Sequence, residues 1–162
     1  MTIRAATLSF FIIVSYTSIN AQHQTLGPGS CGIGQNNCHF NDNEWWKNDP
    51  HKMSVLSMYD ELSKYEKMAE LAGVDAKNLF RGDNLCMKCH GTVVTGQEKK
   101  ETDNGVSCES CHGPGSGYKD PHIEGDPKMG DQRPGYIKGF QLGMLELFNL
   151  DERAEVCVSC HY

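Results

Sequence analysis

The segment Gly105-Val106-Ser107-Cys108-Glu109-Ser110-Cys111-His112 contains a Cys-x-x-Cys-His motif, and the same motif occurs twice more in the chain. The other copies are Cys86-Met87-Lys88-Cys89-His90 and Cys157-Val158-Ser159-Cys160-His161. Two cysteines three positions apart lie on one side of a helical turn, where each thiol can bond one vinyl group of the same porphyrin. The adjoining imidazole can then bind the iron. The three motifs therefore predict three covalently attached c-type haems.

The remaining two of the eight cysteines form a fourth pair that also precedes a histidine. Six residues separate Cys31 from Cys38, and His39 follows directly. The glycines and asparagines between the thiols tolerate turn conformations, so a longer loop can still bring both sulfurs to one porphyrin. We interpret this pair as a fourth haem site. A disulfide between Cys31 and Cys38 is the alternative, because exported chains form disulfides readily.

Two other uses of Cys-x-x-Cys pairs explain the pattern less well. Zinc ribbons combine two such pairs and need no histidine after the second cysteine, whereas all three motifs here carry one. Thioredoxin-like chemistry uses one motif at the start of a helix, within alternating strands and helices that this sequence lacks. The repeated histidine therefore favours haem.

Residues 1–21 have the features of a secretory signal peptide. They begin with one basic residue, Arg4, continue through an apolar stretch, and reach Ala21 as a cleavage residue. The apolar run is short for a membrane span, and no second segment of spanning length follows it. We therefore expect export, with the periplasm as the location, and one multihaem cytochrome domain over 22–162 without a membrane span. An uncleaved anchor is the alternative.

The composition indicates an interior built around cofactors. Only 38% of the residues are hydrophobic, and 17 are glycines. Apolar porphyrin discs would supply much of the core, with the chain wrapped around them. The formal net charge is −6. An acidic surface favours redox partner proteins with basic docking surfaces and argues against a nucleic-acid partner.

Hydrophobic periodicity predicts helices separated by long loops. The clearest helix covers 54–72 and ends at Gly73, with Met58, Met68 and Tyr65 as packing residues. Residues 22–44 and 118–139 are expected to be loops, 141–150 a helix, and Asp151 the cap of a last helix. The expected fold is mainly α with a large irregular loop fraction. The apolar face expected for the first helix consists of Leu56, Tyr59, Leu62, Met68 and Leu71.

The supply of histidines limits how many irons can have two imidazole ligands, since the chain has seven. The four that follow a cysteine pair are the expected proximal ligands: His39, His90, His112 and His161. His51 and His122 are the expected distal ligands, because each follows an Asp-Pro dipeptide that restricts the backbone. At least one iron would then lack a second histidine from this chain.

The order of these motifs resembles the multihaem cytochromes c of the c-552/c-554 type. The resemblance includes Trp45, the Asp49-Pro50-His51 segment, the Pro121-His122 pair and, most specifically, the segment 105–114. It implies a helical, loop-rich protein that holds haems in close stacked or angled pairs and passes electrons in periplasmic respiratory chains. The wider spacing between Cys31 and Cys38 departs from the family. The resemblance also implies further chain beyond Tyr162, so the sequence is expected to be incomplete.

Two functions follow from these observations. The first is single-electron transfer between respiratory partners through three or four haem c groups. The second is a haem enzyme, or a fragment of one, that acts on a small nitrogen or sulfur compound at an iron with an open axial position. No separate constellation of catalytic acids, bases or nucleophiles stands out in the sequence. Electron transfer is favoured over the enzyme, because it is the general role of such haem ligation.

Overall fold

The computed structural model describes residues 23–32 and 39–161, so the expected signal peptide and Cys38 lie outside the described residues. Within these ranges the chain forms helices and irregular segments, with no strand, and the isolated bridge between Arg81 and Glu101 is the extent of β pairing. The prediction of a mainly helical fold is confirmed. The α-helices are α1 (Phe40–Trp46), α2 (Ser54–Asp60), α3 (Leu62–Leu71), α4 (Met87–His90), α5 (Cys108–His112), α6 (Pro134–Gln141) and α7 (Leu150–Val158). The 3-10 helices are η1 (Pro28–Ser30), η2 (Ala76–Asn78), η3 (Pro121–Ile123) and η4 (Pro127–Gln132).

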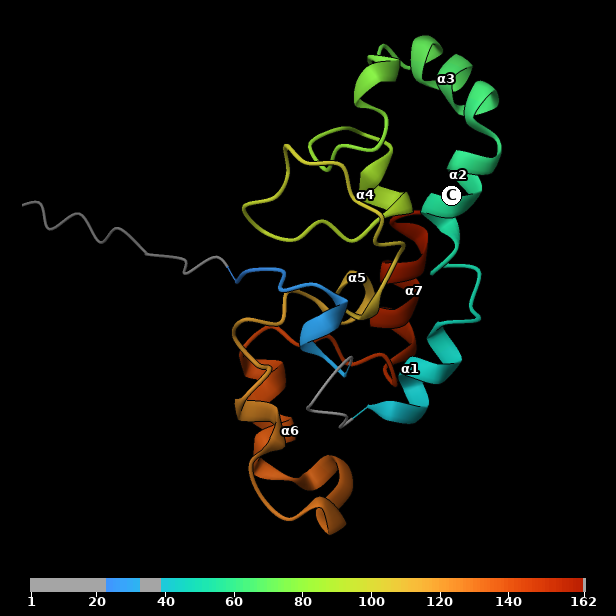
Figure 1. The fold of residues 1–162 in the computed structure, drawn as a ribbon. Helices are drawn as coiled ribbons and strands as arrows, with labels where there is room; N and C mark the ends of the chain where they lie inside the picture. The colour runs from blue at the N-terminus through green and yellow to red at the C-terminus, as the bar shows by residue number, and fades with distance from the viewer. Residues whose placement is uncertain (1–22, 33–38, 162) are drawn as a thin grey trace, which may run out of the picture.

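The arrangement of these elements gives the molecule two ends and a middle (Figure 1). Helices α2 and α3 lie at one end together with η2, and α6 lies at the other end with η3 and η4. Helices α5 and α7 occupy the middle. No helix in the described ranges combines the length and apolar character that crossing a membrane requires.

The predicted helix over 54–72 is two helices, because Glu61 leaves the helical conformation at φ −111° and ψ 34°. The predicted end at Gly73 is confirmed, since this residue adopts φ 70° directly after α3. The predicted apolar face is wrong. The break at Glu61 prevents one helical period from running through both helices, so Val55, Met58 and Ala69 are buried instead. The five residues predicted for that face are exposed.

The hydrophobic core lies between α2, α3, η2 and α4. Its fully buried side chains include Val55, Met58, Leu79 and Met87, and the Tyr59 ring stacks on Phe80 with ring centroids 3.7 Å apart. Met87 is the second residue of the Cys86–His90 motif. The core therefore fixes the position of this motif helix directly.

The prediction of an extended loop over 118–139 is wrong. Its prolines do not break helices; Pro121, Pro127 and Pro134 each stand at the first position of one, where the missing amide hydrogen costs nothing. The prediction of a helix over 141–150 is also wrong, because α6 ends at Gln141 and α7 begins at Leu150.

Two predicted helix starts also need correction. The cap of α7 is Asn149 rather than Asp151, since the Asn149 side chain accepts the Asp151 amide at 3.0 Å. The expected loop over 22–44 ends early, because α1 begins at Phe40. The Trp46 indole at the end of α1 donates to the Val106 carbonyl at 2.8 Å, which ties α1 to the segment before α5.

Candidate functional site

Each Cys-x-x-Cys-His motif forms a single helical turn. The amide of His90 donates to the Cys86 carbonyl at 3.0 Å, and the amide of His161 donates to the Cys157 carbonyl at 2.9 Å. Helix α5 consists of the motif Cys108–His112 itself. In an α-helical turn the first cysteine, the second cysteine and the histidine project to neighbouring positions. The expected local geometry of covalent attachment is therefore present at all three motifs.

His39 and His122 face each other, although they are distant in the sequence. Their ring centroids are 6.1 Å apart and their planes are inclined by only 16°. His39 precedes α1, and His122 belongs to η3, which packs against α6. The Arg133 guanidinium donates to the His122 carbonyl at 2.8 Å and holds this turn in place.

His51 and His161 form a second pair. Their ring centroids are 5.9 Å apart, and their planes are nearly perpendicular at 84°. The Val106 amide donates to the His51 carbonyl at 2.9 Å, and the Ser54 hydroxyl lies 2.7 Å from the same carbonyl and 2.6 Å from that of His90. These contacts connect the His51 segment to two of the motif helices.

Both separations fit two axial ligands of one metal ion. A metal–imidazole bond is about 2.0 Å long, so two imidazoles on opposite sides of one ion place their ring centres about 6 Å apart. Among the described residues no group of three or more His, Cys, Asp and Glu side chains is arranged to hold a bare metal ion. A porphyrin supplies four nitrogens itself and needs only axial ligands from the protein. The paired imidazoles therefore fit haem iron.

Hydrogen bonds to Nδ1 leave Nε2 available as the ligand atom in three of the paired histidines. Nδ1 of His39 lies 3.1 Å from the Asp42 carboxylate, and Nδ1 of His51 lies 2.7 Å from the Asp49 carboxylate. Nδ1 of His122 lies 2.6 Å from the Lys119 carbonyl. Acceptors at Nδ1 fix the tautomer with Nε2 unprotonated, which is the usual arrangement at metal-bound histidines.

His90 and His112 have a different environment. Burial lowers the pKa of both imidazoles, so both are neutral at neutral pH and able to bind a metal. The Tyr65 ring meets the His90 ring edge to face, with centroids 5.7 Å apart. Within the described ranges neither imidazole has a second histidine ring opposite it. The packing role predicted for Tyr65 agrees with this contact.

Contacts between cysteines give the spatial order of the motifs. A hydrogen bond between the Cys31 and Cys108 thiols lowers the pKa of Cys31 to about 6 and raises that of Cys108. The Cys89 and Cys160 thiols lie near each other's segments, at 3.9 Å from the Ser159 carbonyl and 4.0 Å from the Lys88 carbonyl, respectively.

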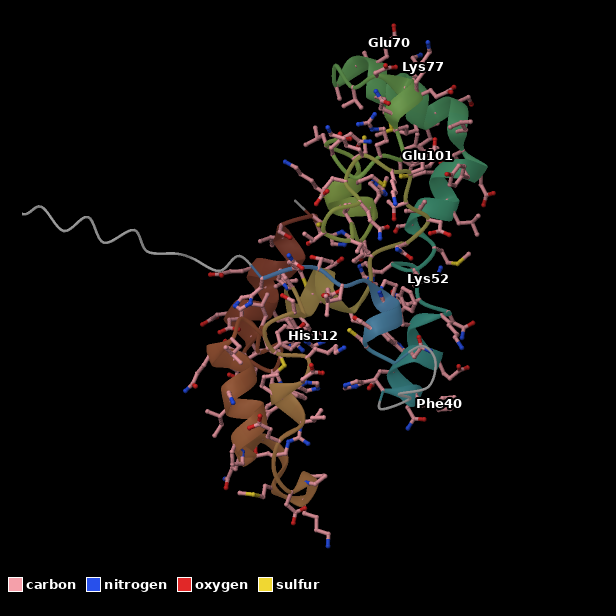
Figure 2. The ribbon with its side chains drawn as sticks, turned by 60° about the vertical axis from the view of Figure 1, so that its left-hand side comes forward. Phe40, Lys52, Glu70, Lys77, Glu101 and His112 are labelled. Atoms are coloured by element: carbon pink, nitrogen blue, oxygen red, sulfur yellow. The ribbon has the colours of Figure 1, made fainter. Side chains whose placement is uncertain are left out.

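The Cys108–His112 motif is also close to the Cys157–His161 motif. Burial raises the pKa of Cys111, and the nearby Cys157 and Cys160 thiols raise it further. The motifs that end in His39, His112, His161 and His90 are therefore neighbours in that order. Figure 2 places His112 in the middle of the molecule, between the end that carries Glu70 and Lys77 and the segment that carries Phe40.

The sequence reasoning missed three carboxylates at the site. Asp42 and Asp49 accept hydrogen bonds from histidine rings. Glu109 is buried inside the Cys108–His112 motif and accepts the amides of Leu26, Gly27 and Gly115. The spacing of Asp49 two residues before His51 does not by itself indicate this role, because Asp120 has the same spacing and lies beside Lys119 instead. The three partners of Glu109 likewise depend on the tertiary fold.

Comparisons with known proteins agree with this geometry. The family described as Cytochrome c554 and c-prime matches residues 35–113. The chain is similar to cytochrome c-554 of Nitrosomonas europaea (strain ATCC 19718 / CIP 103999 / KCTC 2705 / NBRC 14298), with 28% identity over 122 residues. That alignment covers 70% of this chain and 48% of the relative, so the chain spans about half the length of this curated relative. No solved structure matches.

The matched range contains His39, His51 and the motifs Cys86–His90 and Cys108–His112, and both matches are to c-type cytochromes. Their family implies covalently bound haem c and a function in electron transfer. The matches and the paired histidines thus support the resemblance found in the sequence: residues 35–113 match the family described as Cytochrome c554 and c-prime, and the chain is similar to a cytochrome c-554.

Proposed function

We propose that the chain is an exported, periplasmic multihaem cytochrome that relays single electrons between respiratory partners through four haem c groups. Bound haem supplies an iron that gains or loses one electron without forming or breaking a bond. The pairs Cys86/Cys89, Cys108/Cys111 and Cys157/Cys160 hold three of the groups through thioether bonds. Cys31 and Cys38 hold the fourth.

The observation that carries this proposal is the separation of the paired imidazoles. His39 with His122, at 6.1 Å, and His51 with His161, at 5.9 Å, each fit the two sides of one iron. We assign each pair to one haem as its axial ligands, and His90 and His112 as proximal ligands of the other two. Axial imidazoles on both sides suit electron transfer, because the coordination of the iron stays the same in both oxidation states.

The cysteine contacts support a relay order. Cys31 contacts Cys108, Cys111 is near Cys157, and Cys160 lies beside the segment of Cys89. The proposed order of the redox centres is therefore the His39, His112, His161 and His90 sites. This order differs from the order of the motifs in the sequence. Its terminal sites, at His39 and His90, are the proposed points of exchange with partner proteins.

Haem stoichiometry tests the proposal directly. The exported chain, produced in a host with haem-attachment machinery, is expected to carry four covalent haems by intact mass and by pyridine haemochrome absorbance. Cys38→Ser is expected to weaken or remove one of them, whereas a Cys31–Cys38 disulfide would leave the number unchanged. A mass equal to that of the bare polypeptide would refute the assignment.

The enzyme alternative gives a different spectroscopic result. A carrier with closed coordination contains low-spin irons that do not bind carbon monoxide. A high-spin iron that binds carbon monoxide and turns over a small nitrogen or sulfur compound would support the enzyme instead. His90 is the site to examine first, because its ring contacts Tyr65 rather than another histidine in the described part of the chain.

A further inference from the structure

The chain contains two Asp-Pro-His segments whose sequences are identical but whose contacts differ. In the first segment, Asp49 accepts the backbone amide of His51 at 2.9 Å and lies 2.7 Å from Nδ1 of the same residue. The Asp49 side chain is only 14% exposed. One carboxylate oxygen therefore fixes both the backbone and the ring of His51, and less of this side chain is exposed to solvent than of Asp42 or Asp120.

In the second segment the aspartate does not contact the histidine ring. Asp120 is 88% exposed, and its carboxylate lies 3.9 Å from the Lys119 ammonium. Nδ1 of His122 instead lies 3.1 Å from the Tyr118 carbonyl and 2.6 Å from the Lys119 carbonyl. The acceptors at His122 are therefore neutral, whereas the acceptor at His51 is a carboxylate.

The hydrogen bonds of the proximal histidines, His39 and His161, do not offset the difference in acceptor charge between His51 and His122. Asp42 lies 3.1 Å from Nδ1 of His39, but its side chain is 80% exposed, so solvent and salt screen its charge. No hydrogen bond to the His161 ring is found in the described ranges. Two carboxylate–imidazole contacts therefore occur in the described part of the two histidine pairs, and the carboxylate is partly buried in the Asp49–His51 contact and exposed in the Asp42–His39 contact.

A carboxylate that accepts the Nδ1 proton makes the imidazole more basic and a stronger donor through Nε2. The added negative charge stabilises ferric iron more than ferrous iron, because the ferric ion carries the greater positive charge. The reduction potential falls as a result. Neutral carbonyl acceptors at His122 produce a smaller effect of the same sign.

We propose that Asp49 is a positioning residue that orients His51 and lowers the reduction potential of the iron bound between His51 and His161. Asp120 has no such role at His122. This inference rests on the proposed pairing of His51 with His161. In the reduction that it affects, the iron passes from ferric to ferrous by taking one electron from a one-electron donor, and the Nδ1 proton stays on the imidazole.

The test compares Asp49→Asn with Asp120→Asn in the haem-loaded full chain. Asparagine can still accept both hydrogen bonds of Asp49 through its amide oxygen, so the substitution removes mainly the charge. A redox titration with one-electron mediators is monitored by electron paramagnetic resonance at fixed pH. The ferrous-to-ferric ratio of the His51/His161 iron at a given ambient potential is expected to rise about tenfold in Asp49→Asn, which corresponds to about 59 mV.

The control variant Asp120→Asn is expected to leave the reduction potentials of the His39/His122 and His51/His161 irons unchanged, since the Asp120 carboxylate lies beside Lys119 rather than the His122 ring. Equal potentials in Asp49→Asn and in the unmodified protein, at full haem content, would overturn the inference. Asp49→Ser is a second neutral replacement whose hydroxyl can accept the His51 amide, and the potential should rise in it as well. If the unmodified protein shows no iron with two imidazole ligands at this site, the proposed pairing fails instead, which is a distinct result.

Discussion

Gly105 lies where two backbone segments come so close that a hydrogen atom is the largest side chain that fits. A Cβ placed there would lie 2.6 Å from the His51 carbonyl oxygen, and the Lys52 carbonyl would also clash with it. These obstacles are backbone atoms, which cannot rotate away as a side chain could. The approach matters because the Val106 amide bonds the His51 carbonyl next to it.

Gly105→Ala is therefore expected to destabilise the haem-loaded protein by about 1–3 kcal/mol, because the two segments must move apart. Denaturant unfolding followed by Soret absorption measures the change. Gly29→Ala is the matched control, since nothing lies within 4 Å of a Cβ at that exposed position. Equal losses of stability in the two variants would contradict the argument.

The ring planes of the histidine pairs give a spectroscopic prediction. Imidazole planes set the splitting of the iron dπ orbitals: near-parallel planes separate these orbitals in energy, and perpendicular planes leave them nearly degenerate. His39 and His122 are inclined by 16°, and His51 and His161 by 84°. We expect one rhombic low-spin signal and one highly anisotropic signal with a large maximum g value in frozen ferric protein. His122→Ala should remove the first signal and keep the second.

At the scale of single residues, the sequence predicts the candidate haem ligands but not all of their contacts. The spacing of cysteines and histidines predicts which side chains could bind haem, and the Asp-Pro-His segments predict both distal candidates. The contacts of the two aspartates differ because the chain before each histidine differs. Residues 118–119 turn so that their carbonyls face the His122 ring, whereas the turn before His51 directs the Asp49 carboxylate to its ring. Identical tripeptides cannot reveal that difference.

Helix α5 is fastened to the rest of the molecule by its own buried carboxylate. Glu109 is 5% exposed and accepts the amides of Leu26 at 2.9 Å, Gly27 at 2.6 Å and Gly115 at 2.7 Å. These hydrogen bonds connect the segment before η1 and the loop after α5 to the motif between Cys108 and Cys111. Hydrogen bonds to a charged group are stronger than those between neutral groups.

Glu109→Gln is expected to lower the free energy of unfolding by about 1–3 kcal/mol, because an amide group cannot accept all three donors and leaves one buried amide unsatisfied. The measurement is denaturant unfolding at full haem content. Glu66→Gln on the exposed side of α3 should change the stability by less than about 0.5 kcal/mol. A stability of Glu109→Gln that matches this control would contradict the anchoring role.

Helices were predicted well where a glycine ends them and poorly where proline begins them. Gly73 ends α3 as expected, in a backbone conformation that suits glycine. Proline breaks a helix when it lies in the interior but is favoured at the first position. A loop was predicted at Pro121, Pro127 and Pro134, whereas each of them begins a helix. The break at Glu61 has no glycine or proline to signal it in the sequence.

The whole molecule carries a formal net charge of −6, which should affect its reactions with small redox reagents. Raising the salt concentration from 0.01 M to 1 M shortens the screening length from about 30 Å to about 3 Å. Electron exchange with a cationic one-electron oxidant is expected to slow several-fold over this range, and exchange with an anionic oxidant to accelerate. Stopped-flow kinetics measures both rates. Rates that change in the same direction for the two oxidants would contradict steering by the acidic surface.

The spatial order of the sites could not be predicted from the sequence. Cys31 meets Cys108, and the segment of Cys89 meets that of Cys160, so neighbours in space come from distant motifs. Local periodicity carries no information about such contacts. The number of attachment motifs could be predicted, whereas their neighbours required the fold.

The pairing of His51 with His161 has a consequence for how the protein matures. One ring lies before α2 and the other follows α7, so neither half of the chain can complete this site alone. Contacts between such distant segments form late, since a long loop must close first. Covalent attachment at each Cys-x-x-Cys-His turn needs only local sequence, and it can precede that closure. The haems would then be attached before the polypeptide becomes compact, and the His51 imidazole would bind opposite His161 late in folding.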